Sequence, residues 1–246
     1  MSTSIDRTRR LLTCGILAGP LFLLVVLSQA PARDGFDPAT HPLSLLSLGP
    51  NGWVQTTNFL VAGLLTLAGA VGLRRGLRGQ PAGTWGPLLI GCQGIALVCA
   101  GVFATDPADG FPPGIAPPAT TTGHAVLHAV APTIGGIALD LACLVFARAF
   151  HRRGQSGWAA YCLATLAADV AAAGAAGTTG DFRWLLTGAA VTWLWVSAVL
   201  AHVVRDASGL LPAPTMRHAV GVDGQPPAPT SEVRRPTGAS ARRRER

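Results

Sequence analysis

This sequence predicts an all-α fold, a polytopic membrane protein built as a six-transmembrane-helix bundle. Three observations predict it: few charges, six long apolar runs, and arginines that gather between alternate runs. Charged residues are 13% and hydrophobic residues 49% of the 246 positions, with a mean hydropathy of +0.40. A soluble globular protein carries about 25% charged residues, so this composition argues against a water-soluble fold.

The six apolar runs are long enough, or nearly so, to cross the hydrocarbon core of a bilayer, which is about 30 Å thick. Each run must be helical because lipid offers the backbone no hydrogen-bond partner, and the alternation of a membrane β-barrel is missing. The first run could also be a signal peptide, but at roughly 18 residues it exceeds the usual apolar part of one. We expect helices at about residues 11–28, 54–73, 85–104, 124–146, 158–176 and 184–204.

The arginines orient these helices. Nearly all of them lie in residues 1–10, 74–83 and 148–157 and in the C-terminal tail, and the chain has no lysine. Under the positive-inside rule this pattern places the N- and C-termini in the cytoplasm and the polar stretch 41–59 on the outer face. The same placement argues against a nucleic-acid partner, although the net charge is +7.

Three regions follow from this topology. Residues 1–10 form a cytoplasmic N-terminus and residues 11–204 the transmembrane domain. Residues 205–246 are rich in Pro, Gly, Ser and Arg, which predicts a disordered, basic cytoplasmic tail. The arginines at its end could contact anionic lipid head groups, but a solvated tail without a specific partner is the favoured interpretation.

Polar residues concentrate in the stretch 41–59, which begins with His41. Ser44 and Ser47 would share a face of a short helical segment that lies on the bundle. Gln55 and Asn58 recur at the same spacing in the first turns of the second helix. Buried amides need partners, so these side chains either fasten the loop to the helix, which we favour, or line a ligand site.

A second polar group is expected on the same face. His124 and His128 lie one helical turn apart, as metal-binding histidine pairs do, and Asp106 lies in the preceding loop. With His41 they make a conceivable zinc or acid–base site. We favour a structural role, in which Asp106 caps a turn or helix end and the histidines close the loop, and we predict no cofactor. The five cysteines lie in apolar runs without CxxC spacing, so neither a disulfide framework nor a cysteine zinc site is expected.

Two carboxylates, Asp140 and Asp169, lie inside predicted helices. An acid in a membrane helix should face the bundle interior or a cavity, where it could relay a proton, bind a cation or sit protonated against a neighbouring hydroxyl. Asp140 is about seven residues from the cytoplasmic end of its helix, and Asp169 about as far from the outer end of its own. We therefore expect the two acids at different depths and do not pair them.

Three segments resemble a known family: residues 41–59, the stretch Phe103-Ala-Thr-Asp-Pro107, and Gly123-His124 at a helix start. They are similar to the bacterial integral membrane proteins called domain of unknown function 998, over about residues 11–204. The resemblance implies six helices and a bacterial plasma membrane location, but no settled activity. The positions that match its motifs are Ser44, Ser47, Asp106 and His124.

Three functions remain open. The first is a non-enzymatic membrane protein whose outer polar site binds a ligand or a partner. The second is a membrane-embedded, metal-dependent hydrolase that uses the outer histidines and Asp106. The third is a small proton- or cation-coupled transporter that uses Asp140 or Asp169.

Overall fold

The computed structural model describes residues 2–209, and residues 210–246, most of the predicted tail, lie outside the described part. It confirms the all-α fold: no strand occurs within residues 2–209, and six helices are long and apolar enough to cross a membrane. The helices are α1 (Ser2–Gln29), α2 (Gly52–Gly76), α3 (Trp85–Val102), α4 (Gly123–Arg152), α5 (Ser156–Thr179) and α6 (Arg183–Gly209). Two short 3₁₀ turns, η1 (Ala30–Ala32) and η2 (Leu43–Ser47), lie between α1 and α2.

Two helices continue well beyond their apolar runs. α1 already begins at Ser2, so the arginines of residues 7–10 lie on the helix. α4 continues to Arg152, six residues past its predicted end. Long arginine side chains can extend to water while the helix that carries them continues. A charged residue therefore ends an apolar run in the sequence without ending the helix.

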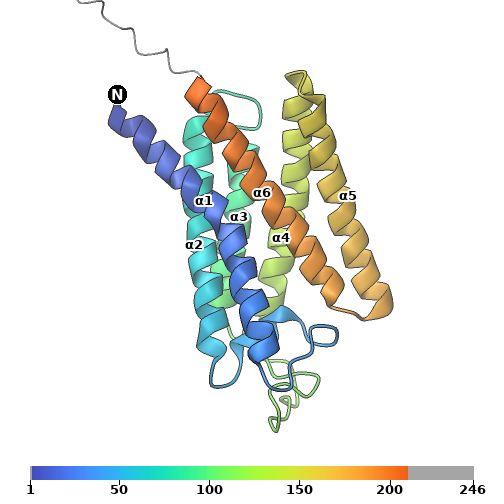
Figure 1. Cartoon of the computed structure of the whole chain (residues 1–246). Helices are drawn as coiled ribbons and strands as arrows, with labels where there is room; N and C mark the ends of the chain where they lie inside the picture. Colours follow the sequence, from blue (N-terminus) through green and yellow to red (C-terminus); the bar gives the residue numbers. More distant parts are fainter. Residues whose placement is uncertain (1, 210–246) are drawn as a thin grey trace, which may run out of the picture. The chain divides into compact units, whose positions relative to one another are not determined.

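Within residues 2–209, each helix packs against the next one in sequence, and α6 returns to pack against α1 (Figure 1). We call the end that carries residues 30–51 and 103–122 the long-loop end, and the opposite end the arginine end. At the crossing of α1 and α2, a Cβ atom on Gly15 would stand 2.7 Å from the Cα atom of Gly69. Only glycine allows two helix backbones to approach so closely.

Two hydrophobic clusters fill the bundle. The cluster toward the arginine end draws on all six helices and contains Phe146, Trp195 and Leu200, each at most 2% exposed. The cluster toward the long-loop end contains Phe22, Phe59 and Trp193 and comes from α1, α2, α3, α6 and the segment around η2. No residue of α4 or α5 belongs to this second cluster among the described residues. The hydrophobic cluster at the long-loop end therefore comes from four of the six helices and the η2 segment.

Candidate functional site

Gln55 and Asn58, expected to fasten the first loop to the second helix or to line a ligand site, are buried and bond to α1 instead. Gln55 is fully buried and accepts a hydrogen bond from Nε2 of Gln29. Asn58, 4% exposed, donates from Nδ2 to the carbonyl oxygen of Phe22 at 3.1 Å and to Oε1 of Gln55 at 3.3 Å. Buried amides that bond across an interface fix two helices relative to each other, so this cluster joins α1 to α2. Gln29 is the member that sequence reasoning missed, since its position at the end of an apolar run gave no signal.

His41 connects the two long loops. It is 6% exposed, its Nδ1 accepts from the backbone N–H of Asp37 at 2.9 Å, and its Nε2 donates to the carbonyl oxygen of Asp109 at 3.0 Å. This pairing fixes a neutral imidazole with the proton on Nε2. Arg33 supports the same region by donating to the carbonyl oxygens of Leu46 and Leu48.

The serines of the first loop bond locally. η2 buries Leu45 and Leu46 against the bundle, and Oγ of Ser47 donates to the carbonyl oxygen of Ser44 at 2.7 Å. This contact satisfies the end of a short 3₁₀ turn, which leaves carbonyl groups without helical partners. The segment thus lies on the bundle through its leucines.

Asp106 holds the start of α4. Its carboxylate accepts from the backbone N–H of Thr122 at 2.8 Å and from the Thr122 hydroxyl at 2.7 Å, and that hydroxyl accepts from the N–H of Ala125 at 3.2 Å. Thr122 is the N-cap of α4, so Asp106 orients the capping side chain.

The two histidines of α4 pack against the end of α3. His124 meets the ring of Phe103 edge-on, with 5.5 Å between centroids. His128, 3% exposed, donates from Nδ1 to the carbonyl oxygen of Phe103 at 2.7 Å and contacts the ring of Phe59. Within residues 2–209 no three His, Cys, Asp or Glu side chains are placed to hold one metal ion. The polar residues of the long-loop end therefore divide into separate contacts and do not converge.

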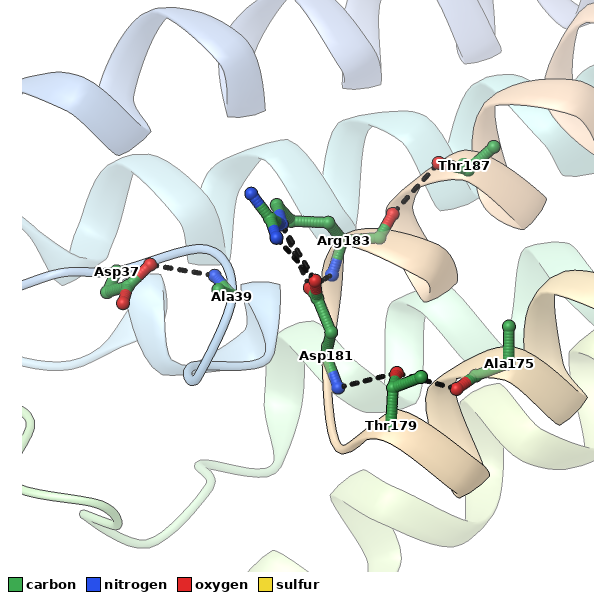
Figure 2. A network of polar contacts seen from close by, with 7 residues as sticks. All are labelled: Asp37, Ala39, Ala175, Thr179, Asp181, Arg183 and Thr187. Atoms are coloured by element: carbon green, nitrogen blue, oxygen red, sulfur yellow. Dashed lines mark hydrogen bonds and ion pairs between the residues drawn. The ribbon is translucent and has the colours of Figure 1, made fainter.

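The loop between α5 and α6 is fastened to the first loop by one backbone hydrogen bond, and Figure 2 shows the contacts of Asp181 and Arg183 beside it. The Arg183 guanidinium donates to both carboxylate oxygens of Asp181, and the N–H of Phe182 donates to the carbonyl oxygen of Ala39 at 2.9 Å. These hydrogen bonds from Arg183 hold the pKa of Asp181 below its ordinary value. The α5–α6 connection is thus tied to the α1–α2 loop.

The two intramembrane acids meet, which corrects our expectation of different depths. The carboxyl groups of Asp140 and Asp169 lie close enough across the α4–α5 interface to interact with each other. Asp140 lies twelve residues before the end of α4 at Arg152, and Asp169 thirteen residues after the start of α5 at Ser156. At a rise of 1.5 Å per residue these distances are nearly equal. The prediction was wrong because it ended α4 six residues too early.

The surroundings of the pair come from three helices. On α6, a Cβ atom added to Gly188 would stand 2.5 Å from Oδ1 of Asp169. On α5, one turn before Asp169, Thr165 is 1% exposed and its hydroxyl interacts with Tyr161. Oδ1 of Asp140 is buried without a hydrogen-bond partner. Sequence reasoning missed Gly188 and Thr165, since a small residue or a threonine in an apolar helix is ordinary. The pair therefore sits in a polar, incompletely satisfied spot of an apolar region.

Aromatic side chains close the bundle between the pair and the arginine end. The rings of Phe146 and Trp195 pack edge to face, and Nε1 of Trp195 donates to Sγ of the buried Cys162 at 3.3 Å. Beyond them, His202 stacks on Trp158 with 4.4 Å between centroids, and its Nε2 lies 3.3 Å from Asp206. The acid pair thus has a packed side toward the arginine end.

A comparison with protein families gives one match, and it covers most of the chain. The model of the family described as "Protein of unknown function (DUF998)" matches residues 16–203. The comparisons with curated proteins and with solved structures found no match. The matched range runs from within α1 to near the end of α6 and includes the acid pair and both long loops. Residues 2–209 of the chain contain six helices able to span a membrane, and the chain belongs to the DUF998 family, a family of unknown function.

Proposed function

We propose that this membrane protein binds and releases a proton at the pair of Asp140 and Asp169, as one step of proton- or cation-coupled transport. The observation that carries the proposal is that two carboxyl groups from different membrane-spanning helices lie close enough to interact. An ionised carboxylate only accepts hydrogen bonds, so a bond between the two requires a proton on one of them. Two like charges in contact also disfavour the doubly ionised state.

The membrane adds to this preference. A charged aspartate at the centre of a membrane helix costs about 3 kcal/mol on insertion scales. With one shared proton the pair still carries one negative charge, which a second proton or a cation would neutralise. The loading and release of that second positive charge is the step that we assign to transport.

The long-loop end supports the alternatives less well. A ligand or partner site there, or a metal-dependent hydrolase, needs polar groups that are free to bind. His41, Asn58 and Asp106 use their hydrogen-bonding atoms on the chain itself, whereas Gln55 Nε2 and His128 Nε2 are buried without a partner. These contacts favour a structural role for the long-loop residues, which fix the loops and the start of α4.

We place the protein in a bacterial plasma membrane with the long-loop end outside, because the arginine end would face the cytoplasm under the positive-inside rule. A cytoplasm-dependent fluorescent reporter fused to the C-terminus should then be active in cells. An alkaline phosphatase fusion that is active instead would reverse this orientation.

Proteoliposomes test the proposed transport step. Purified protein in vesicles with an imposed pH gradient should speed the decay of that gradient, measured with an internal pH-sensitive dye. Asp140→Asn and Asp169→Asn should each abolish the effect, whereas Asp34→Asn, which changes an exposed carboxylate of the first loop, should not. Equal rates in all three variants and the wild type would exclude the acid pair from transport.

A further inference from the structure

The turn between α4 and α5 forms a groove at the arginine end. This groove has a volume of about 490 Å³ and is lined by Gly154, Gln155, Ser156, Gly157, Trp158 and Tyr161. Figure 1 shows the turn at the same end of the bundle as the start of α1 and the end of α6. Asp169 lies about 20 Å further along α5 at 1.5 Å per residue, so the groove is separate from the acid pair.

The groove lies at the level of lipid head groups. α5 has 24 residues, which corresponds to about 36 Å of helix, and the hydrocarbon core of a bilayer is about 30 Å thick. The first turn of α5 therefore extends beyond the hydrocarbon. The rings of Trp158 and Tyr161 meet edge to face there, with 5.9 Å between centroids, and such aromatic residues collect at the membrane–water interface.

The start of α5 offers hydrogen-bond donors to an anion. The first backbone N–H groups of a helix have no helical partner, and no side chain caps α5 at Gln155. The positive end of the helix dipole lies at the same place. A Cβ atom added to Gly157 would meet nothing within 4 Å, so the first turn is open toward its surroundings.

The charge beside the groove is positive. α4 ends at Arg152, and both Arg152 and Arg153 are exposed directly before the groove in the chain. Arg152 has no ion-pair partner within residues 2–209. The acids of the arginine end in the same range are Asp6 and Asp206, and Asp206 lies 3.3 Å from Nε2 of His202. Charge complementarity therefore selects an anion as the occupant.

Gln155 adds a second requirement. Its side chain lines the groove, and its Oε1 atom is buried without a hydrogen-bond partner. Buried polar atoms are normally paired, and an amide oxygen is satisfied by an N–H or O–H donor. A phosphate diester only accepts hydrogen bonds. The occupant therefore carries a donor group beside its phosphate.

We propose that the groove binds an anionic phospholipid with a hydroxyl-bearing head group, such as phosphatidylglycerol. Its phosphate lies at the N–H groups of the first turn of α5 and near Arg152, and a head-group hydroxyl donates to Oε1 of Gln155. Its acyl chains follow α5 beyond Tyr161, where Ala164 and Ala168 are exposed. A free phosphate ester would leave the aromatic wall and this apolar surface unused, so the occupant is a lipid.

Native mass spectrometry of the detergent-purified full chain tests the inference. The wild type should bind phosphatidylglycerol at least about tenfold more tightly than phosphatidylcholine, which is zwitterionic and has no head-group donor. Gly157→Asp places a carboxylate at the start of α5, which favours the helix but repels phosphate, so binding should weaken at least about tenfold. Arg152→Gln should weaken it in the same direction.

Gly123→Asp is the matched control. Gly123 is the first residue of α4 at the long-loop end, and a Cβ atom added there also meets nothing within 4 Å. This variant changes the net charge equally and should bind the lipid as the wild type does. Equal losses in Gly157→Asp and Gly123→Asp, or equal affinity of the wild type for phosphatidylglycerol and phosphatidylcholine, would overturn the proposal.

Two further comparisons identify the occupant. Phosphatidylmethanol has the same charge as phosphatidylglycerol but no hydroxyl, so the wild type should prefer phosphatidylglycerol and Gln155→Leu should lose that preference. Soluble glycerol phosphate should not displace the lipid, and displacement would show a site for free phosphate esters instead. None of these measurements involves Asp140 or Asp169, so a negative result would leave the proposed transport step standing.

Discussion

Gly188 on α6 lies directly against the carboxyl group of Asp169 on α5, so that a Cβ atom at this glycine would stand 2.5 Å from Oδ1. No real side chain fits at that distance without a shift of the carboxylate or of the α6 backbone. The contact places α6 beside Asp169. A larger residue at position 188 would therefore disturb the position of the Asp169 carboxyl group.

Gly188→Ala should displace Asp169 and separate the two carboxyl groups. Overpacking of this kind costs about 1–3 kcal/mol, so we expect a lower thermal unfolding temperature together with lost pH-gradient decay in proteoliposomes. Gly174→Ala is the control on α5, where an added methyl group meets open space and alanine favours the helix. An unchanged unfolding temperature for Gly188→Ala would show that the contact is loose.

Asn58→Leu should destabilise the joint between α1 and α2. The change removes the hydrogen bond to the carbonyl oxygen of Phe22, which then stays buried without this donor. Loss of a buried partner costs about 1–3 kcal/mol, measured by thermal unfolding in detergent. Thr13→Val is the comparison, because the Thr13 hydroxyl is exposed and bonds only within α1. Equal effects of both substitutions on the unfolding temperature would contradict the claim that Asn58 joins α1 to α2.

We expect that the histidines of α4 bind no zinc. Because His124 and His128 contact Phe103 and no third ligand lies with them among residues 2–209, purified protein should hold far less than one zinc per chain. His124→Ala should leave that value unchanged in elemental analysis. Stoichiometric zinc in the wild type that disappears in His124→Ala would instead support the hypothesis of a metal-dependent hydrolase.

The ion pair of the α5–α6 loop predicts a pH dependence. Arg183 holds the pKa of Asp181 below its ordinary value, so the pair contributes stability above that ordinary value and loses it as the pH falls through the lowered pKa. Arg183→Gln should therefore lower the unfolding temperature slightly at neutral pH, and the difference from the wild type should vanish in acid. A difference that is constant with pH would mean that the ion pair contributes nothing.

Hydropathy predicted the six helices because burial in lipid demands long apolar helical runs. It could not predict where the helices end, since α4 continues through Arg148 and Arg152 into water. That error of less than two turns placed Asp140 and Asp169 at different depths and hid their contact. Asp106 could be foreseen as a residue that caps a helix end, because its partner Thr122 is a local neighbour of the helix start.

Partners from distant segments left no local pattern. Nothing in the sequence around Gln55 indicates Gln29, and nothing around Asp169 indicates Gly188, because both contacts depend on how whole helices pack. Periodicity describes one helix at a time.

Infrared spectroscopy of the purified protein at neutral pH tests the central claim most directly. The account predicts a carbonyl stretch of a protonated carboxyl group that is absent from the double variant Asp140→Asn/Asp169→Asn and kept in Asp34→Asn. No such band in the wild type, or a band that survives in the double variant, would contradict a proton held between Asp140 and Asp169.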